Sequence, residues 1–484
     1  MAYDLSRVQQ IGQYCYEIPR AADGSMRTSA RLYADEEILR SAAEDRSLNQ
    51  LTNVAWLPGI VGSALAMPDI HEGYGFPIGG VAATGLKDGV VSPGGVGYDI
   101  NCGVRLLTGS LDANEVRPHL SRLMDAVTQA VPSGVGRGGD VRLKRARLAD
   151  VLEGGAQWAA QAGYGSREDA EHCEEGGRIA RARADAVSDR AQDRGLDQVG
   201  TLGSGNHFLE FDEVVDVYDD RAADAFGLRP GQLVVQIHSG SRGLGHQVCT
   251  DYVRRFQTST KRFGYDLPDR ELVCAPVESD EGQDYLAAMS AAANYAWANR
   301  QVMTEAVRRA CERLRGAGLP ALILSVLYDV AHNVAKIETH QVRGKSLPLC
   351  VHRKGATRAF PPGHPDVPAV YRSVGQPVLV PGDMGTASYV LRGTDVAMAE
   401  TFGSSCHGAG RVMSRGAARS RVDARDLRQR LEQKGIVVRA GSLKGLAEEA
   451  PEAYKDIHRV VEVVHGAGLA LKVARLRPLG VVKG

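Results

Sequence analysis

The sequence predicts an α+β fold in which mixed β-sheets and surrounding helices form a single large domain. Two long segments have apolar residues at helical spacing, and short β-branched runs end in glycine-containing loops, as strands do. No internal repeat, low-complexity block or Ser/Pro-rich linker divides the 484 residues. We therefore treat residues 1–484 as one domain, although the length alone would also allow two or three.

Four elements of this fold can be placed along the chain. Apolar spacing predicts helices at about 171–193 and about 281–314, both rich in Ala and Arg and with polar faces suited to solvent. The runs "LVVQI" at 233–237 and "PVLVP" at 377–381 predict strands, because they are short, β-branched and bounded by turn residues. Helices and strands thus occur in the same domain.

Composition sets limits on the class of protein. An apolar content of 43% is typical of a globular chain, and 58 basic against 58 acidic residues indicate no overall affinity for a polyanion. The eight cysteines are scattered, unlike a disulfide framework, and the start has no apolar core of signal-peptide length. No stretch reaches the roughly 18 apolar residues of a membrane span. We expect a soluble, cytoplasmic protein with reduced thiols.

Glycine-rich loops carry the chemically distinctive residues. Fourteen of the 56 glycines concentrate in five short segments, "GGVGYDINCG" (94–103), "GTLGSGNH" (200–207), "HSGSRGLGH" (238–246), "PGDMG" (381–385) and "CHGAG" (406–410). Glycine lets the backbone approach a ligand closely, so these loops are candidates for the lining of one site. Tight turns between strands are the alternative interpretation for any single loop.

Five residues in or near these loops offer metal-ligand atoms: Asp99, Cys102, His207, His238 and His332. One oxygen, one sulfur and three imidazoles suit Zn, Mn, Fe or Co better than Ca or Mg. Neither "HExxH" nor paired "CxxC" occurs, which disfavours a zincin or a zinc ribbon. Each residue taken alone would more often be an ordinary structural residue.

Two segments are candidates for phosphate binding. "HSGSRGLGHQ" places Arg242 among Gly and Ser just before an expected helix start, where backbone N–H groups can also face an oxyanion. "HRKGATRAF" gathers His352, Arg353, Lys354 and Arg358, although surface charge without function would look the same. The chain has no Walker loop and no K-x-D-G signature, which disfavours those two nucleotide chemistries.

These segments together resemble one known family. The motifs "GGVGYDINCGVR", "GTLGSGNHFLE", "IHSGSRGLGHQ", "YDVAHNVAK", "HRKGATRAF", "PGDMGTASYVL", "TFGSSCHGAGR" and "RPLGVVKG" occur in the order found in the RtcB family of RNA ligases, the tRNA-splicing ligases. "PDIHEGYGFPIGG" at 68–80 extends the similarity towards the N-terminus. The resemblance covers essentially the whole chain, and it implies an RtcB-like fold.

The resemblance implies an activity and a set of cofactors. Family members join an RNA 3′-phosphate or 2′,3′-cyclic phosphate end to a 5′-hydroxyl end, using GTP and manganese, in tRNA splicing or RNA repair. His407 matches the histidine that becomes guanylylated, and an RNA–ppG end is then formed. The five candidate ligands match the metal ligands, with Cys102 able to bridge two manganese ions. Some relatives use an archease as activator.

The nucleotide-binding residues are likewise implied by the resemblance. They are Asn206, Glu210, Asn333, Pro381, Gly382, Asp383, Met384, Ser388, Gly408, Ala409, Gly410, Tyr454 and Lys483. RNA or phosphate contacts are expected from Arg242, Arg353, Lys354 and Arg411. Asp383 departs from the pattern, because the family often has Ser there and an anion beside a nucleotide is not a neutral exchange.

Two other functions remain open from the residues alone. A metal-dependent phosphodiesterase or phosphatase acting on RNA ends would use the same ligands and leave His407 as a general acid. An RNA-end binding protein with a decayed centre is the second, although every candidate ligand is still a competent ligand type. The apolar C-terminus "RPLGVVKG" is expected to dock against the body and hold Lys483 in place.

Overall fold

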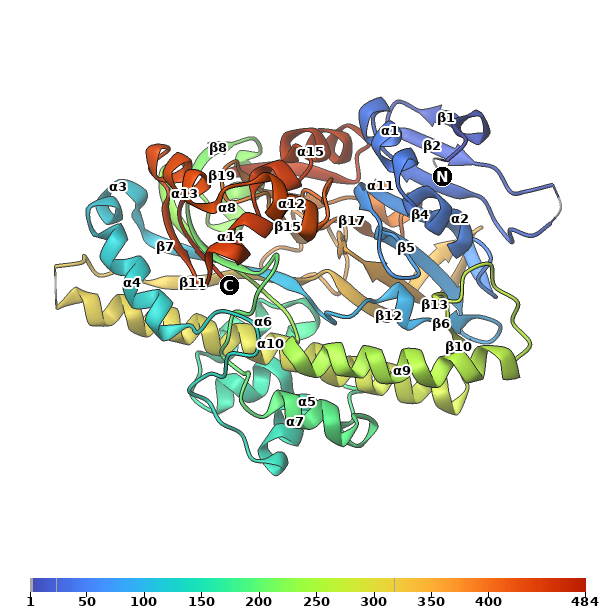
Figure 1. The fold of residues 1–484 in the computed structure, drawn as a ribbon, viewed down its shortest axis with the longest axis horizontal. Coiled ribbons are helices and arrows are strands. Elements are labelled where there is room, and N and C mark those ends of the chain that lie inside the picture. The colour runs from blue at the N-terminus through green and yellow to red at the C-terminus, as the bar shows by residue number, and fades with distance from the viewer. Residues whose placement is uncertain (1–2, 23, 317) are drawn as a thin grey trace.

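Two large β-sheets dominate the structure of this protein, a computed structural model that describes residues 3–22, 24–316 and 318–484. Figure 1 shows the sheets side by side, with long helices crossing below them and shorter helices above. Each sheet combines strands from distant parts of the chain. The predicted α+β class, with several sheets and surrounding helices, is confirmed.

The first sheet has seven strands. In spatial order they are β1 (Gln9–Gly12), β2 (Cys15–Ile18), β3 (Ala30–Tyr33), β4 (Ile60–His71), β5 (Ile78–Gly85), β13 (Lys345–Lys354) and β12 (Asn333–Val342). Neighbours run antiparallel except for β3 and β4, which are parallel. The sheet therefore joins the N-terminal strands to a hairpin from the middle of the chain.

The second sheet has eight strands and contains the C-terminus. In spatial order they are β11 (Leu324–Ala331), β7 (Gly103–Asp112), β9 (Gln232–Ser239), β8 (Phe208–Val217), β19 (Ala470–Lys483), β16 (Ser388–Gly393) and β15 (Pro377–Val380), with β18 (Val437–Ala440) pairing beside β19. β18 and β19 are parallel, and the other pairs are antiparallel. The predicted strands at 233–237 and 377–381 are confirmed as β9 and β15.

Two short strand pairs complete the sheets. β6 (Val90–Val91) pairs with β10 (Ala275–Pro276), and β14 (Ala356–Arg358) pairs with β17 (Ser404–Cys406). In the second pair Cys406 lies opposite Ala356, whose N–H donates to the carbonyl of His332 at 3.1 Å. This pairing brings the "CHGAG" loop, distant in sequence, next to His332.

Fifteen α-helices surround the sheets within the described residues. They are α1 (Glu36–Glu44), α2 (Ser47–Val54), α3 (Ala113–Val116), α4 (Leu120–Ala130), α5 (Arg145–Gln161), α6 (Arg167–Glu171), α7 (Asp189–Gly195), α8 (Asp220–Phe226), α9 (Arg242–Arg262), α10 (Asp280–Arg315), α11 (Asp395–Glu400), α12 (Arg415–Arg421), α13 (Ala424–Gln433), α14 (Leu443–Glu448) and α15 (Ile457–Gly466). Figure 1 shows α9 and α10 crossing the lower side of both sheets, with α5 and α7 below them.

Helix α10 confirms the helix predicted at 281–314, but more of it is buried than expected. Ser279 caps its start by accepting the N–H of Gly282 at 3.1 Å, and the alanine-rich sequence favours a helix throughout. The expected solvent-facing polar side is present mainly in the C-terminal turns, where Arg309, Arg313 and Arg315 are exposed, because residues 285–304 are buried without interruption. The helix lies between the sheets and α5, so its polar side chains bond to neighbouring loops.

The prediction of a single helix at 171–193 is wrong. This stretch contains the end of α6, two short 3₁₀ turns and part of α7. Glu175, Gly176 and Gly177 adopt positive φ angles of 57°, 60° and 71°, which a right-handed helix cannot contain. The N–H of Ile179 donates to Oδ1 of Asn294 on α10 at 2.7 Å, so the buried helix side chain replaces a helical hydrogen bond.

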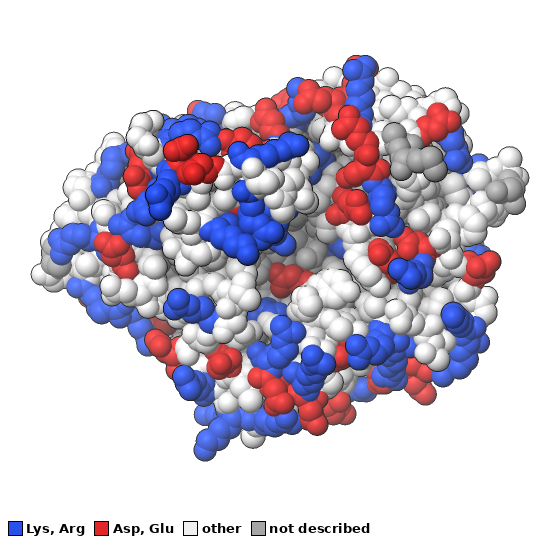
Figure 2. Space-filling view, viewed as in Figure 1, with Lys and Arg blue, Asp and Glu red and all other residues white. Residues whose placement is uncertain are grey.

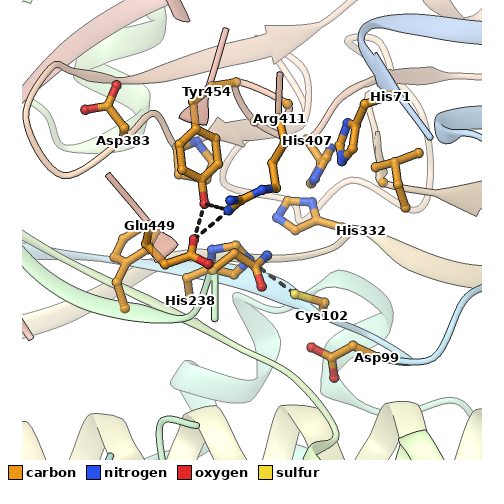
Figure 3. A pocket seen from close by; sticks show the side chains of 18 of the residues that line it. His71, Asp99, Cys102, His238, His332, Asp383, His407, Arg411, Glu449 and Tyr454 are labelled. Atoms are coloured by element: carbon orange, nitrogen blue, oxygen red, sulfur yellow. Dashed lines mark hydrogen bonds and ion pairs between the residues drawn. The ribbon is translucent and has the colours of Figure 1, made fainter. Parts of the chain in front are cut away.

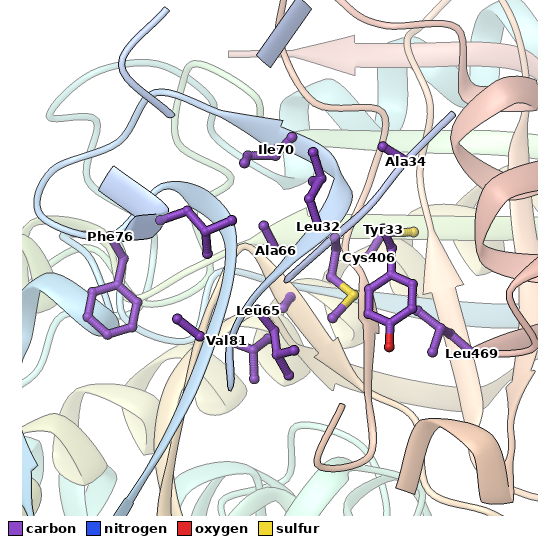
Figure 4. Close-up of a cluster of buried hydrophobic side chains, with 14 of the residues drawn as sticks. Leu32, Tyr33, Ala34, Leu65, Ala66, Ile70, Phe76, Val81, Cys406 and Leu469 are labelled. Atoms are coloured by element: carbon purple, nitrogen blue, oxygen red, sulfur yellow. The ribbon is translucent and has the colours of Figure 1, made fainter. Parts of the chain in front are cut away.

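A hydrophobic cluster anchors the first sheet to the "CHGAG" loop. Figure 4 shows Leu32 of β3, Leu65 of β4 and Val81 of β5 packed near Cys406, and all four are buried. Together with Leu469 they belong to one continuous core. The strand that precedes His407 is therefore fixed by burial of apolar side chains.

The surface has no single dominant charge. Figure 2 shows Lys and Arg interspersed with Asp and Glu over one face, and basic side chains gather near the centre around a hollow, over α12 and α14. The eight cysteines are all free thiols, as expected. Among the described residues, no helix has both the length and the apolar character that crossing a membrane requires.

Candidate active site and metal centre

A pocket of 310 Å³ lies between the two sheets and the "CHGAG" loop. It gathers most of the residues singled out from the sequence: Asp99, Cys102, Asn206, Glu210, His238, His332, Asn333, Lys354, Pro381, Gly382, Asp383, Met384, His407, Gly408, Ala409, Gly410, Arg411, Tyr454 and Lys483. Figure 3 shows the labelled histidines and Cys102 pointing into one space. Residues spread over almost 400 positions thus form a single site.

Two further predicted residues lie directly behind the pocket wall. Nε2 of His207 lies 2.7 Å from Oδ2 of Asp99 and 3.6 Å from Sγ of Cys102. The hydroxyl of Ser388 accepts the N–H of Gly382 at 3.2 Å. His207 therefore belongs to the ligand cluster, and Ser388 supports the "PGDM" turn.

The thiol of Cys102 is at the centre of the candidate metal ligands. Its sulfur lies 3.2 Å from Nε2 of His238 and 3.6 Å from Nε2 of His207. The ligand atoms of Asp99, Cys102 and His207 all lie within 4.8 Å of one another. This spacing, and the mixture of oxygen, sulfur and nitrogen donors, fit a divalent transition ion.

A tight turn presents Cys102 to the pocket. Asn101 takes a positive φ of 50°, and the N–H of Cys102 donates to the carbonyl of Asp99 at 3.0 Å. The N–H of Asn101 donates to the carbonyl of Asn333 at 2.7 Å. Asn tolerates the left-handed region better than most residues, which explains the D-x-N-C pattern.

His332 and His238 are neutral, and each can offer a nitrogen to a metal. Burial lowers the pKa of both rings well below the usual range. Nδ1 of His332 lies 2.7 Å from the hydroxyl of Thr357, while its buried Nε2 has no partner among the described residues. A buried nitrogen without a partner is costly, so the residues present fit a metal at this position.

His407 is held by a buried carboxylate that the sequence analysis did not single out. Oδ2 of Asp69 accepts the backbone N–H of His407 at 3.0 Å and also bonds its Nδ1. The ring lies 5.3 Å from that of His332, centroid to centroid. With Nδ1 bound, Nε2 is the nitrogen available for chemistry. Asp69 belongs to "PDIHEG", a motif that carried the resemblance but received no role.

Gly410 allows the histidine loop to lie against the strand of Asp69. It takes a positive φ of 74°, and a Cβ there would lie 2.3 Å from the carbonyl oxygen of Asp69. Lys455 supports the same strand by donating to the carbonyls of Pro68, at 3.3 Å, and Ile70. Close backbone packing therefore explains the second glycine of "CHGAGR".

A charged cluster occupies the other end of the pocket. NH1 of Arg411 donates to Glu449 at 3.2 Å and to the hydroxyl of Tyr454 at 3.1 Å, and Tyr454 also bonds Glu449 (Figure 3). Nζ of Lys483 lies 3.9 Å from the same carboxylate. Glu449 was missed because "EEAPEAY" has no distinctive pattern. Its carboxylate lies between the cations that meet there and offsets part of their charge.

The C-terminal strand fixes Lys483, as expected. Lys483 ends β19, is almost fully buried, and donates from Nζ to the carbonyl of Gly205 at 3.3 Å. Burial lowers its pKa, while Glu449 and Glu210 oppose that shift. Burial also raises the pKa of Glu210 well above its usual range. The lysine is a pocket residue and not part of a frayed end.

Asp383 bonds to its own turn. Its carboxylate accepts the N–H of Gly385 and the hydroxyl of Thr386, both at 2.8 Å. Burial raises the pKa of this carboxyl. The carboxylate of Asp383 is therefore satisfied by hydrogen bonds within its own turn, which explains how an acidic residue is accommodated at this position of the pocket.

The four predicted phosphate contacts have different surroundings. Arg411 lines the pocket, and so does Lys354, whose ammonium donates to the carbonyls of Tyr74 and Phe76 and whose pKa burial lowers to about 7. Arg242 starts α9, takes a positive φ of 55°, and donates to the hydroxyl of Thr201 at 3.0 Å. It lies beside the pocket.

The RNA or phosphate contact predicted for Arg353 does not fit its surroundings. Its side chain is fully buried outside the pocket and forms a bidentate pair with Glu338, with distances of 2.6 and 2.8 Å. It also donates to the hydroxyl of Ser404 at 2.8 Å. A guanidinium with these partners has a structural role, because reaching RNA would take the cationic partner away from a buried carboxylate.

Comparisons with known proteins give the same family over most of the chain. The family model described as tRNA-splicing ligase RtcB matches residues 50–484. The tRNA-splicing ligase RtcB of Thermococcus kodakarensis is 55% identical over 481 residues, which cover 99% of this chain and 100% of the relative. The same-named protein of Archaeoglobus fulgidus is 53% identical over 477 residues, 99% of each chain. The RNA-splicing ligase RtcB of Mycobacterium tuberculosis is 56% identical over 438 residues, 90% of this chain and 100% of the relative.

Proposed function

The chain belongs to the RtcB family, and we propose that it is a GTP- and manganese-dependent RNA ligase. It joins RNA ends bearing a 3′-phosphate or 2′,3′-cyclic phosphate to 5′-hydroxyl ends, in tRNA splicing, RNA repair or both. The proposed location is the cytoplasm, and an archease-type protein is the proposed activator. The names of the relatives support the RNA ligase activity.

The geometry of His407 carries this proposal. Its Nδ1 is bonded to the buried Asp69, and its ring lies 5.3 Å from that of His332. A neutral imidazole whose second nitrogen is free can attack the α-phosphorus of GTP. The Nε2–P bond forms, the bond from the α-phosphorus to the bridging oxygen breaks, and pyrophosphate leaves. Asp69 holds the ring and compensates the charge that develops on it.

The later steps transfer the guanylate to RNA. An oxygen of the RNA 3′-phosphate attacks the phosphorus on His407, the P–N bond breaks, and an RNA–ppG end results. The 5′-hydroxyl oxygen then attacks the RNA phosphorus, and GMP leaves. A cyclic phosphate is first opened by water. A metal bound by the cluster around Cys102 would neutralise phosphate charge and orient the leaving groups.

The main alternative is a metal-dependent phosphodiesterase or phosphatase in which His407 acts as a general acid. The two functions are separated by incubating the protein with manganese, GTP and two RNA fragments that carry a 3′-phosphate and a 5′-hydroxyl. We expect a joined product only when GTP is present. Loss of the 3′-phosphate without joining, at a rate independent of GTP, would instead support the alternative.

Lys483 is proposed to select guanine. Its ammonium donates hydrogen bonds and cannot accept them, so it can serve the guanine carbonyl oxygen but not the amine of adenine. We predict that Lys483→Ala binds metal normally but loses on the order of ten- to a hundredfold in GTP use, the scale of a charged, buried hydrogen bond. The rate of self-guanylylation at sub-saturating GTP measures this.

The matched control for Lys483 is Lys472→Ala. Lys472 lies on the same strand, but its ammonium pairs with Glu462 away from the pocket. This variant should react at the wild-type rate. If the Lys483→Ala protein also reacts at that rate, the lysine has no role in nucleotide selection.

A further inference from the structure

Two adjacent buried side chains on α10 lie beneath the candidate metal centre. Asn299 and Arg300 have no exposed surface, although both are strongly polar. Neither lines the pocket and neither is a candidate ligand. Burial of an amide and a guanidinium is costly unless their hydrogen bonds are satisfied. Their partners therefore indicate what they do.

Asn299 connects two of the ligand loops. Its Oδ1 accepts the backbone N–H groups of Gly200 and Thr201 at 2.7 and 3.0 Å. Its Nδ2 lies 3.1 Å from the carbonyl of Thr201, 3.2 Å from the hydroxyl of Ser239 and 3.3 Å from the carbonyl of Gly240. The side-chain amide of Asn299 thus joins the loop that precedes His207 to the loop that follows His238.

Arg300 connects the remaining ligand segments. NH1 donates to the carbonyls of Asn101 and Ser239 at 2.9 and 2.7 Å. NH2 donates to Oδ1 of Asn101 at 3.0 Å, and Nε and NH2 bind the carboxylate of Asp329. The guanidinium therefore bonds the residues next to two candidate ligands, Cys102 and His238. It also bonds the strand that leads to His332.

The strained turn at Asn101 depends on these contacts. A positive φ of 50° is unfavourable for a residue with a side chain, and persists where the surroundings impose it. Arg300 holds both the carbonyl and the side-chain oxygen of Asn101, and the side-chain Nδ2 of Asn101 donates to the carbonyl of Ala293 on α10 at 2.7 Å. Helix α10 thus fixes the direction in which Cys102 leaves the turn.

We propose that Asn299 and Arg300 are positioning residues that fix the relative placement of Cys102, His207 and His238 for metal binding. The inference rests on the proposed function only for the identity of the metal centre. It assigns to α10 a role as the rigid base from which three separate loops take their geometry. Groups that orient ligands in this way typically account for about 10- to 100-fold in metal affinity.

The test compares Asn299→Ala with Asn294→Ala. Asn294 is the same residue type on the same helix, equally buried, and bonds the backbone of Ile179 and Leu152 but no ligand loop. Each purified metal-free protein is checked for folding by thermal unfolding and titrated with Co²⁺, whose absorption spectrum reports thiolate and imidazole ligation. We expect comparable losses of thermal stability in both variants. Only Asn299→Ala should bind Co²⁺ about 10- to 100-fold more weakly than wild type.

Excess metal provides a second readout. If Asn299 positions ligands, raising the manganese concentration should restore self-guanylylation of Asn299→Ala towards the wild-type rate, because only the apparent affinity has fallen. Arg300→Lys keeps the charge but loses the fork that bonds Asn101, Ser239 and Asp329 together. It should show the same weakened Co²⁺ binding, and it decides the question if Asn299→Ala does not fold.

The outcomes separate this inference from the proposed function. Wild-type affinity and spectrum in both the Asn299→Ala and Arg300→Lys proteins would overturn the positioning role, and so would an equal loss of affinity in Asn294→Ala. In both cases the proposed function stands. If the wild-type protein binds no Co²⁺, the metal centre of the proposed function is wrong and this inference is overturned with it.

Discussion

The His407→Ala protein should fold, bind metal and form no covalent guanylate when it is incubated with GTP and manganese. His407 supplies the only nucleophile in the proposed first step, and its Nδ1 is already engaged by Asp69. Alanine leaves no nitrogen to attack the α-phosphorus, so the loss should be complete and RNA joining should disappear with it. Retention of label on a denaturing gel after incubation with α-labelled GTP measures this.

A suitable control for His407 is His119→Ala. His119 precedes α4, makes no side-chain capping bond and lies outside the pocket. It should label like the wild type, which shows that loss of a histidine as such is harmless. Label that persists on the His407→Ala protein would remove this residue from its proposed role and favour a different nucleophile.

The second large effect is expected from Cys102→Ser. The sulfur of Cys102 lies within 3.6 Å of Nε2 of both His207 and His238, and serine offers a harder, more weakly coordinating oxygen at nearly the same size. Replacing a ligand should weaken metal binding by at least about 100-fold, because loss of a group that only orients a ligand already lowers metal affinity by about 10- to 100-fold. Manganese stoichiometry after dialysis should fall by at least one ion, and self-guanylylation should fall with it.

The matched control for Cys102 is Cys311→Ser. Cys311 is also a buried free thiol, but it lies on α10 within a hydrophobic cluster. Burial raises the pKa of its thiol to about 12, so it is a neutral side chain at working pH. Its variant should keep the wild-type metal content. Unchanged metal content and ligation in Cys102→Ser would show that the thiol is structural.

Local pattern predicted some elements of the fold well and one badly. The strands at 233–237 and 377–381 and the helix at 281–314 follow from residue type and spacing alone. The stretch 171–193 has helical spacing too, but Gly176 and Gly177 adopt positive φ, and Asn294 on a distant helix takes over its backbone hydrogen bond. Tertiary contacts decide such segments, and they are not visible in a window of sequence.

Burial was the other property that spacing did not reveal. A helix rich in Ala and Arg looks exposed along its polar face, yet α10 buries Asn294, Asn299 and Arg300, because each finds backbone partners about 60 to 200 positions away. The same reason removes Arg353 from the predicted RNA contacts, since Glu338 pairs with it inside the protein. Satisfied polar groups can be buried, and only the structure shows which are satisfied.

The candidate site was predicted more completely than the fold around it. The glycine loops place most of the predicted residues on one pocket because they adjoin the ends of strands that meet there. Asp69 and Glu449 were missed, although one orients His407 and the other neutralises Arg411. Neither is in a glycine loop, and a single carboxylate carries no signal of its partner.

The most direct test of the account is the mass of the wild-type protein after incubation with GTP and manganese, followed by peptide mapping under conditions that preserve phosphoramidates. We predict a gain equal to one GMP, located on the peptide that contains His407 and lost in acid, as expected for a phosphorus–nitrogen bond on histidine. A protein of unchanged mass that still joins RNA, or a GMP located on another residue, would contradict the proposed mechanism.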